Sequence, residues 1–168
     1  MLQRTPAVLC ALLAGLGDEW THRNYGPGTW SAHEVVAHLI HGERTDWIPR
    51  ARHILAHGTA TAFEPFDREG HASLAREKST GELLELFAAE RAEGLRALRT
   101  FDLSAASLAT KGWHPALGEV TLSQLLCTWV VHDLNHIAQV CKALAYQRKG
   151  DVGVWEAYLS ILGEPRPR

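Results

Sequence analysis

The chain has 168 residues, of which 46% are hydrophobic and 21% are charged, and its formal net charge is −2. This composition is typical of a soluble globular protein, and the length suits one domain with one core, which we assign to residues 1–168. The basic residues are spread along the chain, so we expect no nucleic-acid partner and no binding to an anionic membrane. No apolar run approaches the roughly 20 residues that a membrane span requires.

The cysteines and the N-terminal residues bear on the cellular location of the protein. The three cysteines, Cys10, Cys127 and Cys141, form an odd set without a C-x-x-C motif, so we expect reduced thiols and a cytoplasmic location. The apolar run near the N-terminus has no A-x-A-like cleavage site and leads directly into Asp18 and Glu19. It therefore favours an amphipathic first helix over a signal peptide.

Helix signals dominate the sequence, whereas strand signals are poor because polar and apolar residues show no sustained alternation. Three capping boxes, each a Ser or Thr followed three residues later by Glu or Gln, mark the starts of long helices. They are Ser31 with Glu34, Ser79 with Glu82, and Thr121 with Gln124. An earlier helix is expected to begin at Thr5-Pro6, with Thr5 as the N-cap and Pro6 as the first helical residue.

Glycines, prolines and polar clusters predict where these helices end. The expected ends are Gly15 or Gly17, His57-Gly58, Thr100 and Lys149. Pro49 should kink or briefly break the second helix. Residues 58–78 and 101–119 are long connections, and a short extra C-terminal helix is expected near 152–162, with a stop at 163–165. Four main helices with one or two long connections predict an all-α four-helix bundle that is not a simple array of hairpins.

The fourth predicted helix carries two histidines four residues apart, His132 and His136. Both fall on the apolar stripe of this helix, which also contains Leu125, Trp129 and Ala143 and must face the core. Burying two adjacent imidazoles costs two desolvations unless each ring finds a partner, whereas one shared metal ion satisfies both. The alternative is a pair of core histidines, each hydrogen-bonded to its own neighbour.

A third ligand would have to come from the second helix, where three histidines compete. His38 lies where a polar stripe meets an apolar one. His41 is a competitor, and it is equally consistent with a solvated position at the rim of the bundle. His33, near the helix start, is expected to be solvated.

Other polar residues near these histidines have both a functional and a plain structural interpretation. Glu34 and Glu43 flank His38 and could orient its ring, or they could be capping and surface carboxylates. Trp129 could line a pocket, but a tryptophan on a core stripe is more often core. Asp133 makes an H-D-x-x-H string similar to the zinc-protease motif, yet it points about 100° away from His132, so we interpret it as a polar residue on the helix flank.

Another H-x-x-x-H pair, His53 and His57, differs from the first in its position. It follows Pro49 and lies at a predicted helix C-terminus, where cations are favoured by the helix dipole and the chain end is solvated. We interpret this pair as surface histidines.

Two segments resemble the DinB/YfiT-like family of metal-dependent enzymes: "TWSAHEVVAHLIHGERTDW" and, later, "GEVTLSQLLCTWVVHDLNHIAQV". The matching positions are Trp30, Ser31, Glu34, His38, Leu39, Glu43, His132, His136 and Gln139. The resemblance spans about residues 5–147. It implies a four-helix bundle in up-down-down-up order, a homodimer, and a divalent metal held by His38, His132 and His136 near one end of the bundle.

The resemblance also implies a class of chemistry. Three neutral imidazoles leave a metal an open position, which is typical of catalytic sites. There either water or a low-molecular-weight thiol can be activated, and some relatives are thiol transferases. We expect zinc, with nickel, iron or manganese as alternatives. The sequence thus predicts a metal-dependent hydrolase or thiol transferase acting on a small-molecule electrophile; the alternative is a non-catalytic metal-binding or stress-response bundle, in which His41 closes the site.

Overall fold

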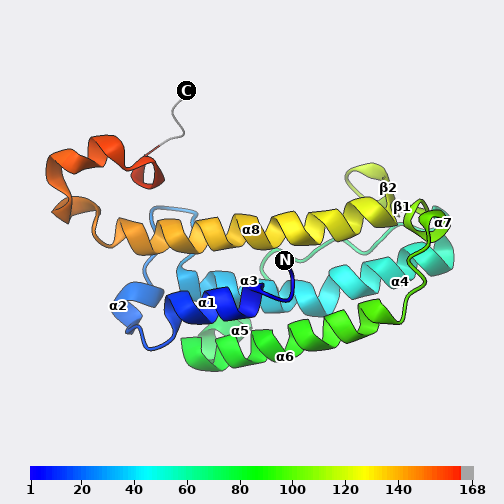
Figure 1. Cartoon of the computed structure of the whole chain (residues 1–168), viewed down its shortest axis with the longest axis horizontal. Coiled ribbons are helices and arrows are strands. Elements are labelled where there is room, and N and C mark those ends of the chain that lie inside the picture. Colours follow the sequence, from blue (N-terminus) through cyan, green and yellow to red (C-terminus); the bar gives the residue numbers. More distant parts are fainter. Residues whose placement is uncertain (164–168) are drawn as a thin grey trace.

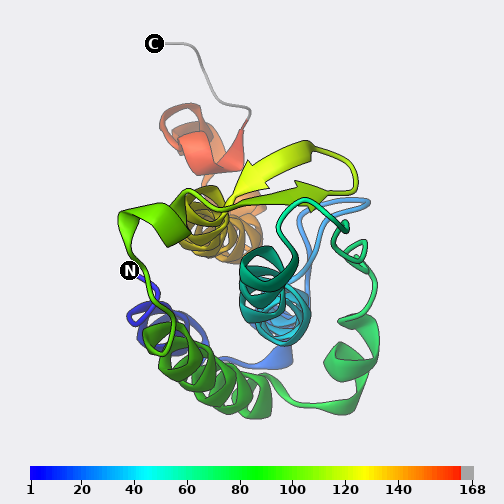
Figure 2. The ribbon, with the colours of Figure 1, turned by 90° about the vertical axis from the view of Figure 1, so that its right-hand side faces the viewer.

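The computed structural model describes residues 1–163 and shows a four-helix bundle (Figure 1). Its helical rods are α1 (Thr5–Leu13), α3 with α4 (Ala32–Thr45 and Trp47–His57), α6 (Thr80–Arg99) and α8 (Leu122–Tyr146). Rods α1 and α8 run in one direction, and α3–α4 and α6 run in the other (Figure 1). This is the up-down-down-up order implied by the family resemblance. The end-on view shows the rods surrounding a shared interior (Figure 2).

Each long helix begins where the sequence predicts, because all three capping boxes form. In each box the N-cap hydroxyl accepts a hydrogen bond from the third helical residue, whose side chain accepts one from the N-cap backbone. The exception is α1, where Thr5 is not the N-cap. Arg4 holds that position, and the buried Thr5 hydroxyl donates instead to Asp133 of α8. A tertiary hydrogen bond has replaced the predicted local one.

The second predicted helix is divided into α3 and α4 at Asp46, rather than at Pro49 itself. Proline has no N–H to offer the carbonyl four residues earlier, and its ring clashes with that carbonyl, which here belongs to Thr45. The break therefore falls one turn before Pro49. It turns Trp47 into the interior, where the indole is 3% exposed and stacks on Trp129 with ring centroids 5.8 Å apart.

The two long connections contain short elements that the sequence did not predict. The first holds α5 (Ala72–Glu77), and the second holds α7 (Ala105–Leu108) and an antiparallel hairpin of β1 (Lys111–His114) and β2 (Gly118–Thr121). Strands of four residues are too short to show the alternation by which strands are recognised. In β1, Gly112 packs so closely that a Cβ would lie 2.6 Å from Ile54 Cγ1.

The C-terminal segment after α8 differs from the prediction. After α8 come three 3₁₀ segments, η1 (Lys149–Asp151), η2 (Gly153–Tyr158) and η3 (Ser160–Leu162), in place of the predicted α-helix. Gly153, with φ of +54°, interrupts any continuous α-helix there. The predicted stop at 163–165 extends outside the described residues. Between α1 and α3, the short helix α2 (Asp18–Thr21) is a single turn.

Two apolar clusters make up the interior, and α3 with α4 connects them. The first packs α1, α3 and α6 around buried residues such as Leu9, Ile40 and Phe87, and the second packs α4 against α8 around Ile54 and Trp129. On α8, His132 and His136 fall between Trp129 of the second cluster and Val140 of the first, and on α3 His38 lies among residues of the first cluster. In the described part of the chain, no helix is long and apolar enough to cross a membrane.

Candidate metal centre

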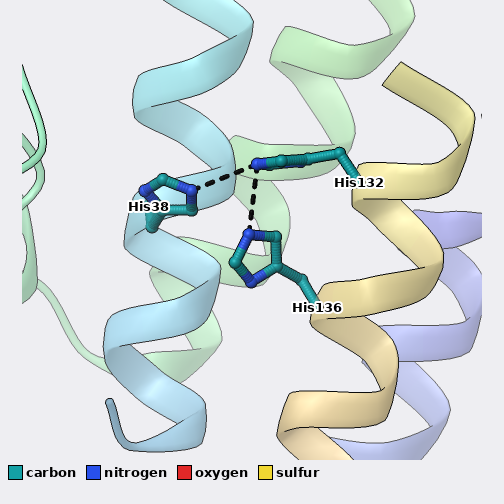
Figure 3. A group of neighbouring side chains, drawn as sticks. All are labelled: His38, His132 and His136. Atoms are coloured by element: carbon teal, nitrogen blue, oxygen red, sulfur yellow. Dashed lines mark hydrogen bonds between the residues drawn. The ribbon is translucent and has the colours of Figure 1, made fainter. Parts of the chain in front are cut away.

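Three histidines from two helices converge between α3 and α8 (Figure 3). His132 Nε2 lies 3.3 Å from His38 Nε2 and 3.1 Å from His136 Nε2. His38 and His136 are each 6% exposed, so the cluster is largely buried. Nitrogen ligands of a tetrahedral zinc ion stand about 3.4 Å apart, given Zn–N bonds of roughly 2.0–2.1 Å. The two distances from His132 therefore match the spacing of ligands to one ion, and the ligand atoms of all three histidines lie within 4.8 Å of one another.

Hydrogen bonds among the histidines do not satisfy the cluster. His132 Nε2 faces two other Nε2 atoms, and a single proton on it can serve only one of them. Within residues 1–163, the Nδ1 atoms of His38 and His132 are buried and have no hydrogen-bond partner. Two independent core histidines would each need partners, as buried polar groups usually have them. A divalent cation bound by the lone pairs of neutral imidazoles would satisfy the three facing Nε2 atoms together, which hydrogen bonds among the rings cannot do.

Gln139, one turn after His136, fixes the orientation of that ring. Its Oε1 lies 2.8 Å from His136 Nδ1, and because an amide oxygen only accepts, the imidazole donates from Nδ1. The Nε2 lone pair of His136 is then directed toward the other two histidines. This is how metal-binding histidines are commonly held by a neighbouring acceptor.

The surroundings keep all three histidines neutral. Burial, together with the neighbouring imidazoles, lowers the pKa of His38 to about 3. Burial likewise lowers the pKa of His132 to about 3, with contributions from His136 and the Arg91 cation. Burial also lowers the pKa of His136. Neutral rings carry the free lone pairs that a metal requires.

These lowered pKa values predict an acid-sensitive metal-free protein. Between pH 6.5 and about 3 the unfolded chain protonates His38 and His132 while the folded protein does not, so stability falls as pH falls through this range. At pH 5 the loss is on the order of 2 kcal/mol per histidine. Urea unfolding of chelator-treated protein from pH 7 to pH 4 measures it. The His38→Gln/His132→Gln variant should show a flatter dependence, and an unchanged slope would contradict the assignment.

The remaining candidate residues around the histidines have structural partners. Glu34 completes the capping box of α3. Glu43 accepts hydrogen bonds from Arg91 and from the indole N–H of Trp129, and Trp129 itself is fully buried core. His41 packs against Phe66, with ring centroids 5.0 Å apart, and is not one of the three converging histidines.

Two other polar residues are buried: His33, which the sequence predicted to be solvated, and Asp133, which it placed on the flank of the helix. His33 is 2% exposed and bonds Thr80 Oγ1 and the Ala75 carbonyl, at 2.9 and 2.7 Å. Asp133 is 1% exposed and pairs with Arg91. Helix periodicity places a residue on a face, but it does not show that α5, α6 or the N-terminus covers that face.

Aromatic rings that the sequence did not single out as site residues surround the histidines. Ring centroids of Trp30 and Phe66 lie 4.6 and 5.7 Å from that of His38, and Trp47 lies 5.0 Å from His132. His71, 3% exposed, lies 5.7 Å from His38. Most of these residues lie in connections or at helix ends, where no periodic pattern could indicate them.

A cavity of about 800 Å³ lies away from the histidines, between α1 and α6. It is lined mainly by small and apolar side chains, and none of the three converging histidines borders it. The chemistry we assign to the histidines therefore does not depend on this cavity.

The other histidine pair is arranged differently. His57 is exposed, and His53 is partly buried with its Nε2 3.0 Å from the Thr61 carbonyl and hydroxyl. In the described part of the chain, three potential metal ligands come together at His38, His132 and His136. The His53/His57 pair has no third potential ligand near it there. This agrees with the surface interpretation.

Fold and site together define a helical-bundle protein with a three-histidine candidate metal centre. The chain belongs to the DinB superfamily, whose family model matches residues 1–140. Among solved structures it is similar to YfiT from Bacillus subtilis, described as a probable metal-dependent hydrolase with an unusual four-helix bundle topology. The TM-score is 0.72 at 24% identity, covering 84% of this chain and 81% of that one, which shows a shared fold. No curated protein matches the chain.

Proposed function

We propose that this protein is a metal-dependent enzyme in which His38, His132 and His136 bind one divalent cation. The observation that carries the proposal is the convergence of their three Nε2 atoms, two of them 3.1 and 3.3 Å from the third. Three neutral imidazoles whose Nε2 atoms face one another are suited to a shared cation, which binds the Nε2 lone pairs of all three. Zinc suits three nitrogen ligands, and nickel, iron or manganese would also bind.

A cation held by three protein ligands supplies an open position at which water, or a small thiol, is activated for attack on an electrophile. The description of YfiT as a probable metal-dependent hydrolase supports the water-using reaction. The thiol-using reaction rests on the family resemblance of the sequence. In either case the chain's own residues hold three neutral rings, orient His136 through Gln139, and surround the site with Trp30, Trp47 and Phe66. Such a lining favours a small, uncharged substrate.

A non-catalytic metal-binding bundle is the second candidate. The observation in its favour is that aromatic rings pack over His38, while the cavity of about 800 Å³ lies elsewhere, between α1 and α6. A cytoplasmic location and a homodimer also belong to the proposal, and light scattering of the purified protein tests the latter.

Activity of the metal-loaded protein distinguishes these functions. Protein loaded with zinc or nickel should hydrolyse small esters or amides, or conjugate a small thiol to an activated electrophile, at rates above the free metal. The His136→Ala variant, treated identically, should show only the rate of buffer with metal. Full metal binding without either activity across such a panel would favour the non-catalytic bundle.

A further inference from the structure

A buried cluster of charges lies in the interior beside the histidine site. Arg91 of α6 is 1% exposed, and so is Asp133 of α8. The guanidinium holds this carboxylate through both oxygens, with Nη1 2.6 Å from Oδ2 and Nη2 2.8 Å from Oδ1. Its Nη2 also donates to Glu43 Oε1 of α3 at 2.9 Å. One arginine thus binds carboxylates from two different helices.

The same cluster includes the start of the chain and the core. Arg91 Nη1 donates to the Leu2 carbonyl at 2.8 Å, and the Thr5 hydroxyl donates to Asp133. Trp129 donates its indole N–H to Glu43 at 3.1 Å. All four rods of the bundle, or the residues leading into them, therefore meet at one guanidinium.

The two helices that Arg91 connects are those that carry the candidate metal ligands. Asp133 directly follows His132 on α8, and Glu43 lies five residues after His38 on α3. A series of contacts leads from the arginine to the site: its guanidinium lies 5.2 Å from the Trp129 ring, Trp129 stacks on Trp47, and Trp47 meets His132 edge to face. A shift of α3 against α8 would disturb the arginine bonds and the histidine spacing together.

Stability alone is a poor explanation for this cluster. Three buried charges incur large desolvation costs, and apolar replacements of such groups are often neutral or stabilising. A better explanation of a buried ion network is that it selects one relative position of the helices that it joins. Arginine suits that role because its rigid planar fork fixes two partners in direction as well as distance, which the single ammonium of lysine does not.

We propose that Arg91 is a positioning residue for the three-histidine site. By binding Asp133 of α8 and Glu43 of α3 at once, it holds the ligand-bearing helices in the register at which the three Nε2 atoms meet. The inference rests on the proposed metal site and adds to it a residue that touches none of the ligands through a hydrogen bond.

Cobalt binding tests this role, because the visible spectrum of Co²⁺ reports its coordination geometry as well as its occupancy. Arg91→Lys keeps the charge and removes the fork, so its dissociation constant for Co²⁺ should rise about tenfold or more, with an altered spectrum. The variant Arg91→Met/Asp133→Asn/Glu43→Gln removes all three charges without leaving one unpaired, and it should show the same two changes. This triple variant tests the same role if Arg91→Lys does not fold.

The matched control is Leu83→Ala, a fully buried position on the same helix outside the cluster. It destabilises the fold by creating a cavity, but it should keep the wild-type affinity and spectrum. Wild-type affinity and spectrum in both Arg91 variants would overturn the inference, as would an equal change in Leu83→Ala. A wild-type protein that binds no cobalt would instead refute the metal site itself.

Discussion

Replacing His132 with Ala is expected to reduce the metal content from about one divalent ion per chain to none, while the protein stays folded. His132 Nε2 is the central atom of the cluster and lies within 3.3 Å of both other Nε2 atoms. Its removal leaves only two histidine ligands, His38 and His136, for the ion. The helix keeps its apolar stripe of Leu125, Trp129 and Ala143, which are 8% exposed or less. Elemental analysis of untagged protein and circular dichroism measure the two effects.

The control for this experiment is His53→Gln/His57→Gln, which alters the other H-x-x-x-H pair. It has the same spacing on a helix, yet it belongs to no three-ligand group among residues 1–163. Its metal content should equal that of the wild type. A His132→Ala protein with a full complement of metal, or a control that loses it, would show that the ion binds elsewhere.

Local chemistry accounts for the parts of the fold that could be predicted. A capping box depends on four consecutive residues, so Ser31, Ser79 and Thr121 could be identified without knowledge of tertiary structure. The inward position of His136 likewise followed from helix periodicity. These features fix where helices start and which faces they bury.

The parts that could not be predicted depend on neighbours far apart in the chain. Thr5 caps nothing because Asp133, 128 residues away, accepts its hydroxyl. His33 is buried because α5 and the start of α6 pack over it, where the Ala75 carbonyl and the Thr80 hydroxyl bond its ring. Periodicity could place Asp133 on a flank of α8, but only the packing of α6 shows that the flank faces a buried arginine.

Replacing Asp133 with Asn is expected to lower the free energy of unfolding by about 3–5 kcal/mol, even without metal. The side chain keeps its shape, but the buried guanidinium of Arg91 loses the carboxylate that binds it twice, and breaking a buried pair leaves an uncompensated charge. Urea unfolding of chelator-treated protein at pH 7 gives the difference.

The exposed pair of Arg148 with Asp151 provides the matched control, since both side chains are more than 60% exposed. Asp151→Asn should change stability by less than about 1 kcal/mol, because solvent screens such a pair. If Asp133→Asn cost no more than this control, Asp133 would be dispensable to the fold. If the triple variant Arg91→Met/Asp133→Asn/Glu43→Gln were more stable than Asp133→Asn alone, the loss would come from the unpaired arginine. If the triple variant were also at least as stable as the wild type, the buried charges would contribute the relative position of α3 and α8 rather than net stability, which is the role proposed for Arg91.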